Sequence, residues 1–297
     1  MAARPQRLVV TLFLCVGLLL AWSRPAWAGQ ARVPVPRRII SLVPAITEVL
    51  FAIGAGPQVI AVSSYDDDPP EVTKLPKVGA LLDPDTERIL ALRPDLVIVY
   101  GSQTTLKEQL AKAGIAWFDY RHAGLGDVFP VFLALGARTG HEAEAARRVA
   151  DMQARLNAVR ARIAGRPHPR TLLVFGREPR TLRTLEASGG IGFLNDMLEL
   201  AGGRNVFAEV KTQAVRVSTE MLITRAPEVV VELHYGSTMS QIDVAAEQAV
   251  WTRVGSVPAV KAGRIHLLFG DHLVVPGPRL VRAVEELARA IHPEAFR

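Results

Sequence analysis

Cysteine is nearly absent from this chain of 297 residues: the only one, Cys15, lies inside an apolar run near the amino terminus. Without that segment, the chain has no residue that can form a disulfide or a thiolate metal site. Lipid attachment at Cys15 is also excluded, because a lipobox cysteine ends its apolar run, whereas here apolar residues continue past it. A chain without cysteine is compatible with an oxidising compartment such as the periplasm.

Long hydrophobic runs are scarce as well, and the one that stands out is at the amino terminus. Two arginines precede the apolar stretch 8–22, and an Ala-Trp-Ala sequence follows at 26–28. This is the layout of a cleavable secretory signal peptide, residues 1–28. The apolar run is shorter than the roughly 20 residues that span a bilayer. We therefore predict a secreted, periplasmic protein, with an uncleaved signal anchor as the alternative.

The chain has little excess of one charge sign. It contains 35 Lys and Arg against 29 Asp and Glu, a net charge of +6. Three of the arginines belong to the predicted signal, so about +3 remains, which gives no reason to predict a nucleic-acid partner. The content of 49% hydrophobic and 22% charged residues is that of a globular protein. About 269 residues then remain, which is enough for two lobes that each have a core.

Short β-branched runs alternate with helical patterns, which is typical of parallel α/β architecture. In the first half the predicted strands are 38–42, 59–65, 95–100 and 115–120, and the predicted helices are 45–53, 84–92, 104–113 and 125–135. In the second half the predicted strands are 171–175, 228–235 and 264–269, and the predicted helices are 191–201, 219–224, 239–249 and 278–291.

The two halves also repeat one another at an offset of 133 residues. Segments 86–95 and 219–228 both begin with Thr-Glu and end with Pro and an acid, directly before an apolar strand. At the same offset, segments 37–42 and 170–175 both place basic residues before apolar ones. Each copy predicts a short capped helix that stops before Pro and a buried strand that follows it. We expect two similar lobes.

The junction of the copies, residues 139–165, has the pattern of a helix rather than of a flexible linker. Thr139 and Glu142 match a capping box. Apolar residues then recur at three- and four-residue steps, at Val149, Met152, Leu156, Val159 and Ile163. About 24 helical residues give roughly 36 Å, enough to run across both lobes. We predict an amino-terminal lobe at 37–138, a carboxyl-terminal lobe at 166–297, and only small hinge motion between them.

Aromatic residues make up only 6% of the chain, but their placement is not random. All four tyrosines fall at the predicted carboxyl ends of strands, where ligands bind in open α/β sheets. Phe175 and Phe269 fall there too, and Trp117 lies on a strand that ends in Tyr120. We interpret this set as the lining of a cleft for a large planar ligand. The alternative is that the rings only fill gaps near the core.

Three histidines, His122, His234 and His272, also lie just past or near strand ends. They allow two further hypotheses, an enzyme or chelatase with a histidine acid/base and a receptor for a free divalent cation. Both are disfavoured because no two histidines are spaced four residues apart and no cysteine supports them. The glycines at 189–192 form an incomplete dinucleotide fingerprint, and we predict a turn that leads into a helix. The three aspartates at 66–68 predict a solvated loop.

Six short motifs follow one another along most of the chain. They are residues 38–48, 63–70, 75–79, 87–97, 202–207 and 276–279. Together they resemble the substrate-binding proteins of ABC importers for iron complexes and cobalamin, and the Ser-Ser-Tyr-x-x-x-Pro-Pro segment is most similar to the cobalamin receptors. The resemblance implies the class III periplasmic-binding-protein fold, in which one long backbone α-helix bridges two Rossmann-like α/β lobes. It also implies a binding protein rather than an enzyme, without a cofactor of its own.

The resemblance further implies roles for individual residues. Tyr65 matches the aromatic residue that packs on the corrinoid, and Tyr100 stands where cobalamin receptors have a Trp. Trp117 and Phe175 match aromatic residues near the same cleft. Arg279, at the start of a predicted helix, is expected to offer polar contacts. The predicted ligand-binding residues are Tyr65, Tyr100, Trp117, Tyr120, Phe175, Tyr235, His272 and Arg279.

The resemblance also implies partners: an ABC permease at the inner membrane and a metal-chelate ligand, bound by a monomer. Glu108 and Glu247 are the nearest candidates for the acids that dock on the permease. Residues 270–275 depart from the aromatic- and acid-bearing loop of cobalamin receptors. A corrinoid, haem and a ferric siderophore therefore remain possible ligands, in that order.

Overall fold

The computed structural model describes residues 34–121, 124–236 and 242–297. The predicted signal peptide, His122 and the start of the predicted helix 239–249 lie outside these residues. Within the described part, no helix is long and apolar enough to cross a membrane.

The amino-terminal lobe is built on a parallel four-stranded sheet with the order β2-β1-β3-β4. Its strands are β1 (Ile39–Ser41), β2 (Val59–Val62), β3 (Leu96–Tyr100) and β4 (Ala116–Tyr120). All four were expected from their apolar, β-branched sequences. β2 is shorter than predicted, because the chain leaves the sheet after Val62 and turns, so Tyr65 lies beyond the strand.

Helices cover both faces of this sheet, as burial of its strands requires. They are α2 (Pro44–Ala52), α3 (Thr86–Ala91), α4 (Thr104–Lys112) and α5 (Val128–Thr139). Alternate residues of β3 enter different buried clusters: Leu96 and Ile98 join the cluster of α2 and α5. Val97 and Val99 join the cluster that contains residues of α3 and α4. Two apolar faces explain why the sequence of β3 is continuously hydrophobic.

The carboxyl-terminal lobe has a mixed sheet with the order β10-β9-β5-β6-β8, and β7 pairs with β5. The predicted strands are present as β5 (Arg170–Gly176), β9 (Val229–His234) and β10 (Ile265–Phe269). The unpredicted strands are β6 (Leu185–Ser188), β7 (Arg204–Asn205) and β8 (Ala214–Val217). This sheet is not parallel throughout, because β6 pairs antiparallel with both β5 and β8. These additional strands are short, and polar residues interrupt them, so the sequence shows no apolar run at their positions.

The α-helices that the structure describes in this lobe lie, in the sequence, between β6 and the carboxyl end of the described chain. They are α7 (Phe193–Leu200), α8 (Thr219–Arg225), α9 (Val244–Ala249), α10 (Pro258–Lys261) and α11 (Leu280–Ile291). The predicted turn before α7 is confirmed. A Cβ atom on Gly190 would lie 2.1 Å from the carbonyl oxygen of Ala208, so only glycine permits this approach of two backbones.

The internal repeat is confirmed at the level of single hydrogen bonds. Asp85 caps α3 by accepting a hydrogen bond from the backbone N–H of Arg88 at 3.0 Å. Ser218, 133 residues later, caps α8 by accepting from the N–H of Met221 at 3.1 Å. The same offset relates the helix starts in both lobes, so α3 and α8 are structural equivalents.

A second equivalent contact is made in each lobe by the acid that follows the capped helix. It binds the backbone at the start of the first strand of that lobe. The Asp95 carboxylate accepts from the backbone N–H of Arg37 at 2.8 Å. The Glu228 carboxylate accepts from the N–H of Arg170 at 2.7 Å. In each lobe the acid after the Pro therefore holds the beginning of the neighbouring strand, which explains why the repeated motif contains an acid there.

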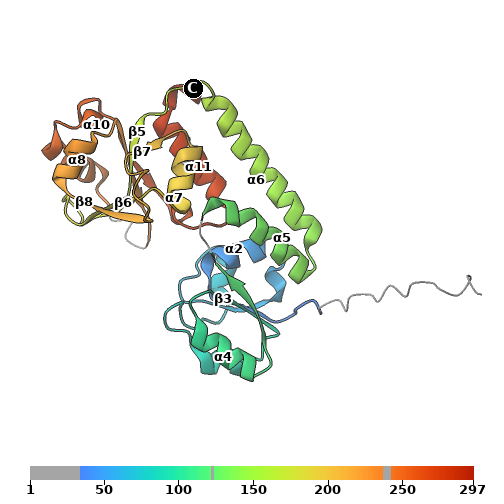
Figure 1. Ribbon diagram of the computed structural model, residues 1–297. Helices are drawn as coiled ribbons and strands as arrows, with labels where there is room; N and C mark the ends of the chain where they lie inside the picture. Colours follow the sequence, from blue (N-terminus) through green and yellow to red (C-terminus); the bar gives the residue numbers. More distant parts are fainter. Residues whose placement is uncertain (1–33, 122–123, 237–241) are drawn as a thin grey trace, which may run out of the picture. The chain divides into compact units, whose positions relative to one another are not determined.

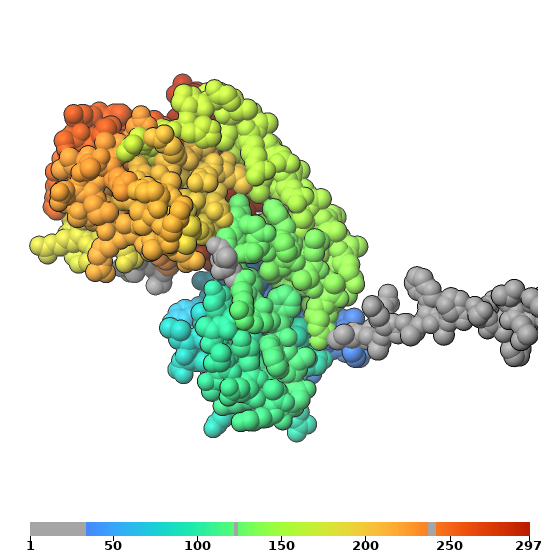
Figure 2. Space-filling model, in the orientation of Figure 1, coloured from blue at the N-terminus to red at the C-terminus, as the bar shows by residue number. Residues whose placement is uncertain are grey.

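One long helix, α6 (Glu142–Ile163), connects the two lobes and packs against both α5 and α11 (Figure 1). Its 22 residues span about 33 Å. The predicted apolar stripe is buried, and the opposite, charged face forms the yellow-green ridge of Figure 2. The fold is thus two α/β lobes bridged by a backbone helix, as the sequence predicted.

The predicted capping box of this helix is wrong. Thr139 is the last residue of α5, and its hydroxyl donates to the carbonyl oxygen of Leu135 at 2.7 Å. Gly140 then takes the left-handed conformation with φ of 78°, which ends α5, and His141 occupies the N-cap position of α6. The glycine separates two helices that the sequence pattern alone merged.

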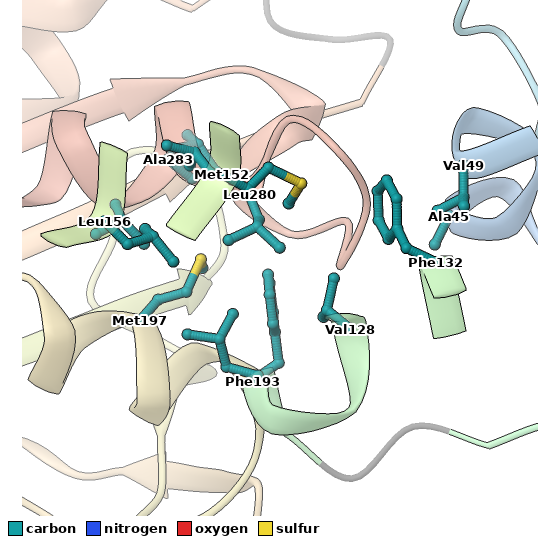
Figure 3. Packing of buried hydrophobic residues seen from close by; sticks show 14 of the residues in the cluster. Ala45, Val49, Val128, Phe132, Met152, Leu156, Phe193, Met197, Leu280 and Ala283 are labelled. Atoms are coloured by element: carbon teal, nitrogen blue, oxygen red, sulfur yellow. The ribbon is translucent and has the colours of Figure 1, made fainter. Parts of the chain in front are cut away.

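One of the buried hydrophobic clusters contains residues of both lobes. Figure 3 shows side chains of α2, α5, α6, α7 and α11 that meet in it. Val128 and Phe193, from opposite sides of α6 in the sequence, belong to the same packed region as Met152 of α6 and Leu280 of α11. Relative movement of the lobes would have to disturb this core, which supports the expectation of small hinge motion.

Candidate functional site

Two tyrosines meet at the carboxyl end of the amino-terminal sheet. Tyr100 and Tyr120 end the neighbouring strands β3 and β4 and are paired in register. Their ring centroids are 5.8 Å apart at 68°, an edge-to-face contact. Tyr120 is buried, and burial, together with Tyr100 and Asp127, raises the pKa of its phenol well above the usual range. Tyr120 therefore packs, as an uncharged phenol, against the ring of Tyr100, and it is not itself exposed at the surface of the site.

Tyr65 is displayed to solvent, with 74% of its surface exposed. It lies in a turn that a buried carboxylate organises: Asp66 accepts from the Ser63 hydroxyl at 2.5 Å and from the Ser63 N–H at 2.9 Å. The Ser63 oxygen in turn accepts from the N–H of Tyr65 at 3.2 Å. The prediction that residues 66–68 form a solvated loop is wrong for Asp66, because its carboxylate holds this turn from inside.

A neighbouring turn, which was not predicted as part of the site, adds a second exposed apolar group. The N–H of Ser64 donates to the carbonyl oxygen of Gly79 at 2.7 Å, so the turn at residues 79–84 is bonded to that of Tyr65. Gln103 connects this turn to β3 by donating to Leu81 O at 2.9 Å and accepting from the N–H of Tyr100 at 2.9 Å. Leu82, at the tip, is 93% exposed.

The carboxyl-terminal lobe has a pocket of about 580 Å³ at the carboxyl ends of β5 and β9. Phe175 and Tyr235, both predicted ligand contacts, lie in its wall. The remaining lining residues are Gly176, Arg177, Pro179, Arg180, Glu232, Leu233, His234, Ile242, Asp243 and Glu247. Aromatic rings and charged groups therefore share one concave surface at the edge where ligands bind in α/β sheets.

Beneath this pocket is a buried cluster of charges. The Arg177 guanidinium lies 2.8 Å from Glu232 and 2.6 Å from Glu247, and the side chains of Arg177 and Glu232 are each 3% exposed. The Trp251 indole N–H donates to Glu232 at 3.1 Å. Burial alone would raise the pKa of Glu232, but its contacts with His234 and Arg177 outweigh burial and lower it.

This cluster corrects the prediction that Glu247 docks on a permease. Its carboxylate is buried, bound to Arg177, and accepts from the backbone N–H of Arg180 at 3.1 Å. Buried charges are retained where they are paired, so the role of Glu247 is to complete the ion cluster. Glu108, the other candidate, is exposed on α4.

Two further residues that were predicted to contact the ligand are bound to side chains of other helices. Arg279, at the N-cap of α11, binds Glu48 of α2 through two hydrogen bonds of 2.7 and 2.9 Å and also pairs with Asp68. It joins the lobes rather than offering a free cation. His272 is 4% exposed, and its Nε2 lies 3.0 Å from Glu286 of α11. His272 is thus enclosed by the fold, whereas the ligand contact of Arg279, whose side chain is 31% exposed, stays a prediction.

The family model described as periplasmic binding protein matches residues 39–269, from β1 of the amino-terminal lobe through α6 to the end of β10. The chain belongs to the periplasmic binding protein family. A vitamin B12-binding protein of Yersinia pestis is 31% identical over 254 residues, which cover 85% of each chain. The crystal structure of the periplasmic vitamin B12 binding protein of Vibrio cholerae has a TM-score of 0.73 at 25% identity and covers 88% of this chain and 98% of that one.

Solved structures of haem-binding proteins resemble this chain about as closely as the Vibrio cholerae structure does, in TM-score and in identity. The periplasmic haem-binding protein of Roseiflexus sp. RS-1, in its apo form, has a TM-score of 0.71 at 26% identity and covers 87% of this chain and 99% of that one. For this periplasmic binding protein, therefore, the comparisons establish the fold and family, and the ligand has to be argued from the site.

Trp117 is the one predicted aromatic contact that this periplasmic binding protein places apart from the others. It lies beside Val97 as the second residue of the edge strand β4, three residues before the strand ends in Tyr120. Three residues of extended chain are about 10 Å. The predicted position of Trp117 on the strand that ends in Tyr120 is confirmed, and its contact with a ligand stays a prediction.

Proposed function

We propose that this protein is the periplasmic receptor of an ABC importer and binds a corrinoid of the cobalamin type between the carboxyl ends of its two sheets. The observation that carries the proposal is Tyr65, a large ring held at 74% exposure by a buried carboxylate–serine turn. An exposed ring in an ordered turn is suited to stack on a planar ligand. The curated relatives named for vitamin B12 binding support the same ligand class.

The two lobes offer complementary surfaces for such a ligand. The amino-terminal lobe presents apolar groups, Tyr65 and Leu82, on mutually bonded turns. The carboxyl-terminal lobe presents the pocket with Phe175 and Tyr235, whose floor is charged. A corrinoid has a flat apolar ring with polar amide side chains at its edge, so stacking on one lobe and hydrogen bonding to the other account for its recognition.

Haem is the second candidate, because structural neighbours of equal similarity are named for haem binding. It needs an axial donor such as a tyrosinate. Burial raises the pKa of Tyr120 and so disfavours its phenolate, which leaves Tyr65 and Tyr100 as phenol donors on that lobe. A ferric siderophore is the third candidate. In each case the metal arrives within the ligand, and the protein needs no resident cofactor.

We assign the protein a binding role rather than an enzymatic one, and a periplasmic location reached through a cleavable signal at residues 1–28. His272, one of the histidines that suggested acid/base chemistry, is buried and paired with Glu286 inside the fold, which supports this assignment. Among the described residues, no group of three or more His, Cys, Asp or Glu is arranged to hold a bare metal ion.

The proposal is tested by calorimetric titration of the mature protein with cyanocobalamin, haemin and a ferric siderophore. We expect one-to-one binding of cyanocobalamin, tighter than that of the other two. Tighter binding of haemin would favour the second candidate. Binding of none of the three would overturn the assignment as a metal-chelate receptor.

For the permease contact we propose Glu87 and Glu220 in place of Glu108 and Glu247. They occupy equivalent positions, 133 residues apart, in the first turns of the equivalent helices α3 and α8, and both are exposed. A receptor with two equivalent lobes can thereby offer one carboxylate from each lobe to two equivalent basic sites on a permease. Glu108 has no counterpart of this kind, since position 241 is a glutamine.

Charge reversal at this pair should uncouple ligand binding from transport. We expect the double variant Glu87→Lys/Glu220→Lys to keep its ligand affinity in calorimetry, because both residues lie outside the ligand-binding turns and pocket, and to lose most ligand import into vesicles that contain the cognate permease. Each single change should cause a partial loss. Glu108→Lys is the matched control and should import normally; loss of import in this control but not in the double variant would contradict the assignment.

A further inference from the structure

His234 is a pocket residue that stacking and hydrogen bonding to a corrinoid do not require. It is the last residue of β9 and lies in the wall of the carboxyl-terminal pocket, with its side chain 13% exposed. The sequence placed it at a strand end but assigned it no partner. In the structure, its surroundings fix one ring nitrogen and leave the other for a ligand.

Two neighbours set the orientation of the imidazole. Its ring stacks on Phe269 of the adjacent strand β10, with centroids 5.0 Å apart and planes at 21°. Its Nε2 atom lies 3.0 Å from Glu232 Oε1, off the line of an ideal hydrogen bond, so the carboxylate orients the ring chiefly through its charge. With Nε2 directed at the carboxylate, Nδ1 is the nitrogen that remains for another partner.

The carboxylate that orients His234 is itself held firmly. Arg177 and Trp251 both bind Glu232, and all three belong to the buried cluster beneath the pocket. Metal-ligating histidines are oriented in this way, with a carboxylate beside one imidazole nitrogen and the other nitrogen free. The carboxylate keeps the proton on the nitrogen next to it, here Nε2, and raises the basicity of the nitrogen that faces the metal, here Nδ1. A single solvated histidine would lack this support.

The number of donors indicates what kind of metal this histidine suits. In the described part of the chain no group of three or more ligating residues surrounds a possible ion position. One donor cannot retain a bare ion, but it is sufficient for a metal that is already bound in a planar macrocycle and has one exchangeable axial position.

We propose that His234 is an axial ligand to the metal of the bound chelate, and that the protein prefers a corrinoid whose upper axial position carries exchangeable water. In the step, the bond between Co(III) and water breaks, the water leaves with its electron pair, and the Nδ1 lone pair forms the new bond; the proton stays on Nε2 and no oxidation state changes. The inference rests on the proposed corrinoid function and adds a specificity to it.

Aquocobalamin and cyanocobalamin test the proposal, because cyanide occupies the position that water leaves open. With wild-type protein we expect a shift of the aquocobalamin absorption bands on binding and an affinity about tenfold above that for cyanocobalamin. In His234→Ala the shift should disappear and the ratio of the two affinities should fall to near one. His234→Gln, of similar size and polarity, should behave like the Ala variant, and far-ultraviolet circular dichroism checks that both are folded.

The wild-type measurement is decisive even if neither variant folds. Equal affinities for the two corrinoids without a spectral shift would overturn the axial-ligand assignment and leave the corrinoid receptor intact. A shift and preference that persist in His234→Ala or His234→Gln would also overturn it. Failure to bind either corrinoid would instead refute the proposed function, and this inference with it.

Discussion

Replacement of Arg177 by methionine should cost the protein about 3–5 kcal/mol of its free energy of unfolding. The Arg177 side chain is 3% exposed and lies between Glu232 and Glu247, which are both buried. Methionine has a similar length but leaves two carboxylates without their counter-charge in a region of low dielectric constant. The loss arises mainly from these uncompensated charges rather than from the strength of the ion pairs themselves.

Urea unfolding at pH 7, followed by circular dichroism, measures this loss. Arg155→Met is the matched control: Arg155 pairs with Glu285 at 3.0 Å, but the two side chains are 45% and 27% exposed. We expect this control to lose less than about 1 kcal/mol, because water already screens the pair. Equal losses in the two variants would show that burial does not decide the energetics of the Arg177 cluster.

The loss should also depend on pH in a definite direction. The contacts with His234 and Arg177 outweigh the effect of burial, so the pKa of Glu232 is lower in the folded than in the unfolded protein. Such a group stabilises the fold above its unfolded pKa, near 4.5, and this stabilisation is lost as pH falls through the folded pKa. The stability difference between wild type and Arg177→Met should therefore shrink on acidification below about 4.5.

Truncation of Tyr65 should have the largest effect on ligand binding. Tyr65→Ala removes the exposed ring and should weaken cyanocobalamin binding by about 1–3 kcal/mol, roughly 5- to 150-fold. Tyr65→Phe keeps the ring and should retain most of the affinity, because a corrinoid needs no phenolate donor from this position. Calorimetric titration of both variants measures the difference.

Trp117→Ala is the control for this experiment, since it removes a larger, partly exposed ring that lies away from the carboxyl ends of the strands. We expect it to bind like wild type. The opposite pattern has a defined meaning as well. If the protein binds haem, and Tyr65→Phe or Tyr100→Phe abolishes a tyrosinate-type ferric spectrum and weakens binding as much as Ala does, the corrinoid assignment is wrong.

The features that the sequence alone determined are those with a local or periodic signal. β3 was recognisable because a strand buried on both faces is continuously apolar, and β9 was recognisable from the three valines with which it begins. The stripe of α6 was recognisable because one face of a helix repeats every three to four residues. The repeat at an offset of 133 was recognisable because each copy needs the same capped helix and the same acid before its strand.

The tertiary structure alone decided what the polar residues do. Arg279 and Glu48 are 231 positions apart in the chain, and Arg177 and Glu247 are 70 apart, so no spacing rule connects them. Whether a charged group lines a cleft or stays buried against an opposite charge depends on which partner the fold brings within about 3 Å. The same reason applies to Leu82, whose exposure results from a turn that is held by hydrogen bonds to other segments.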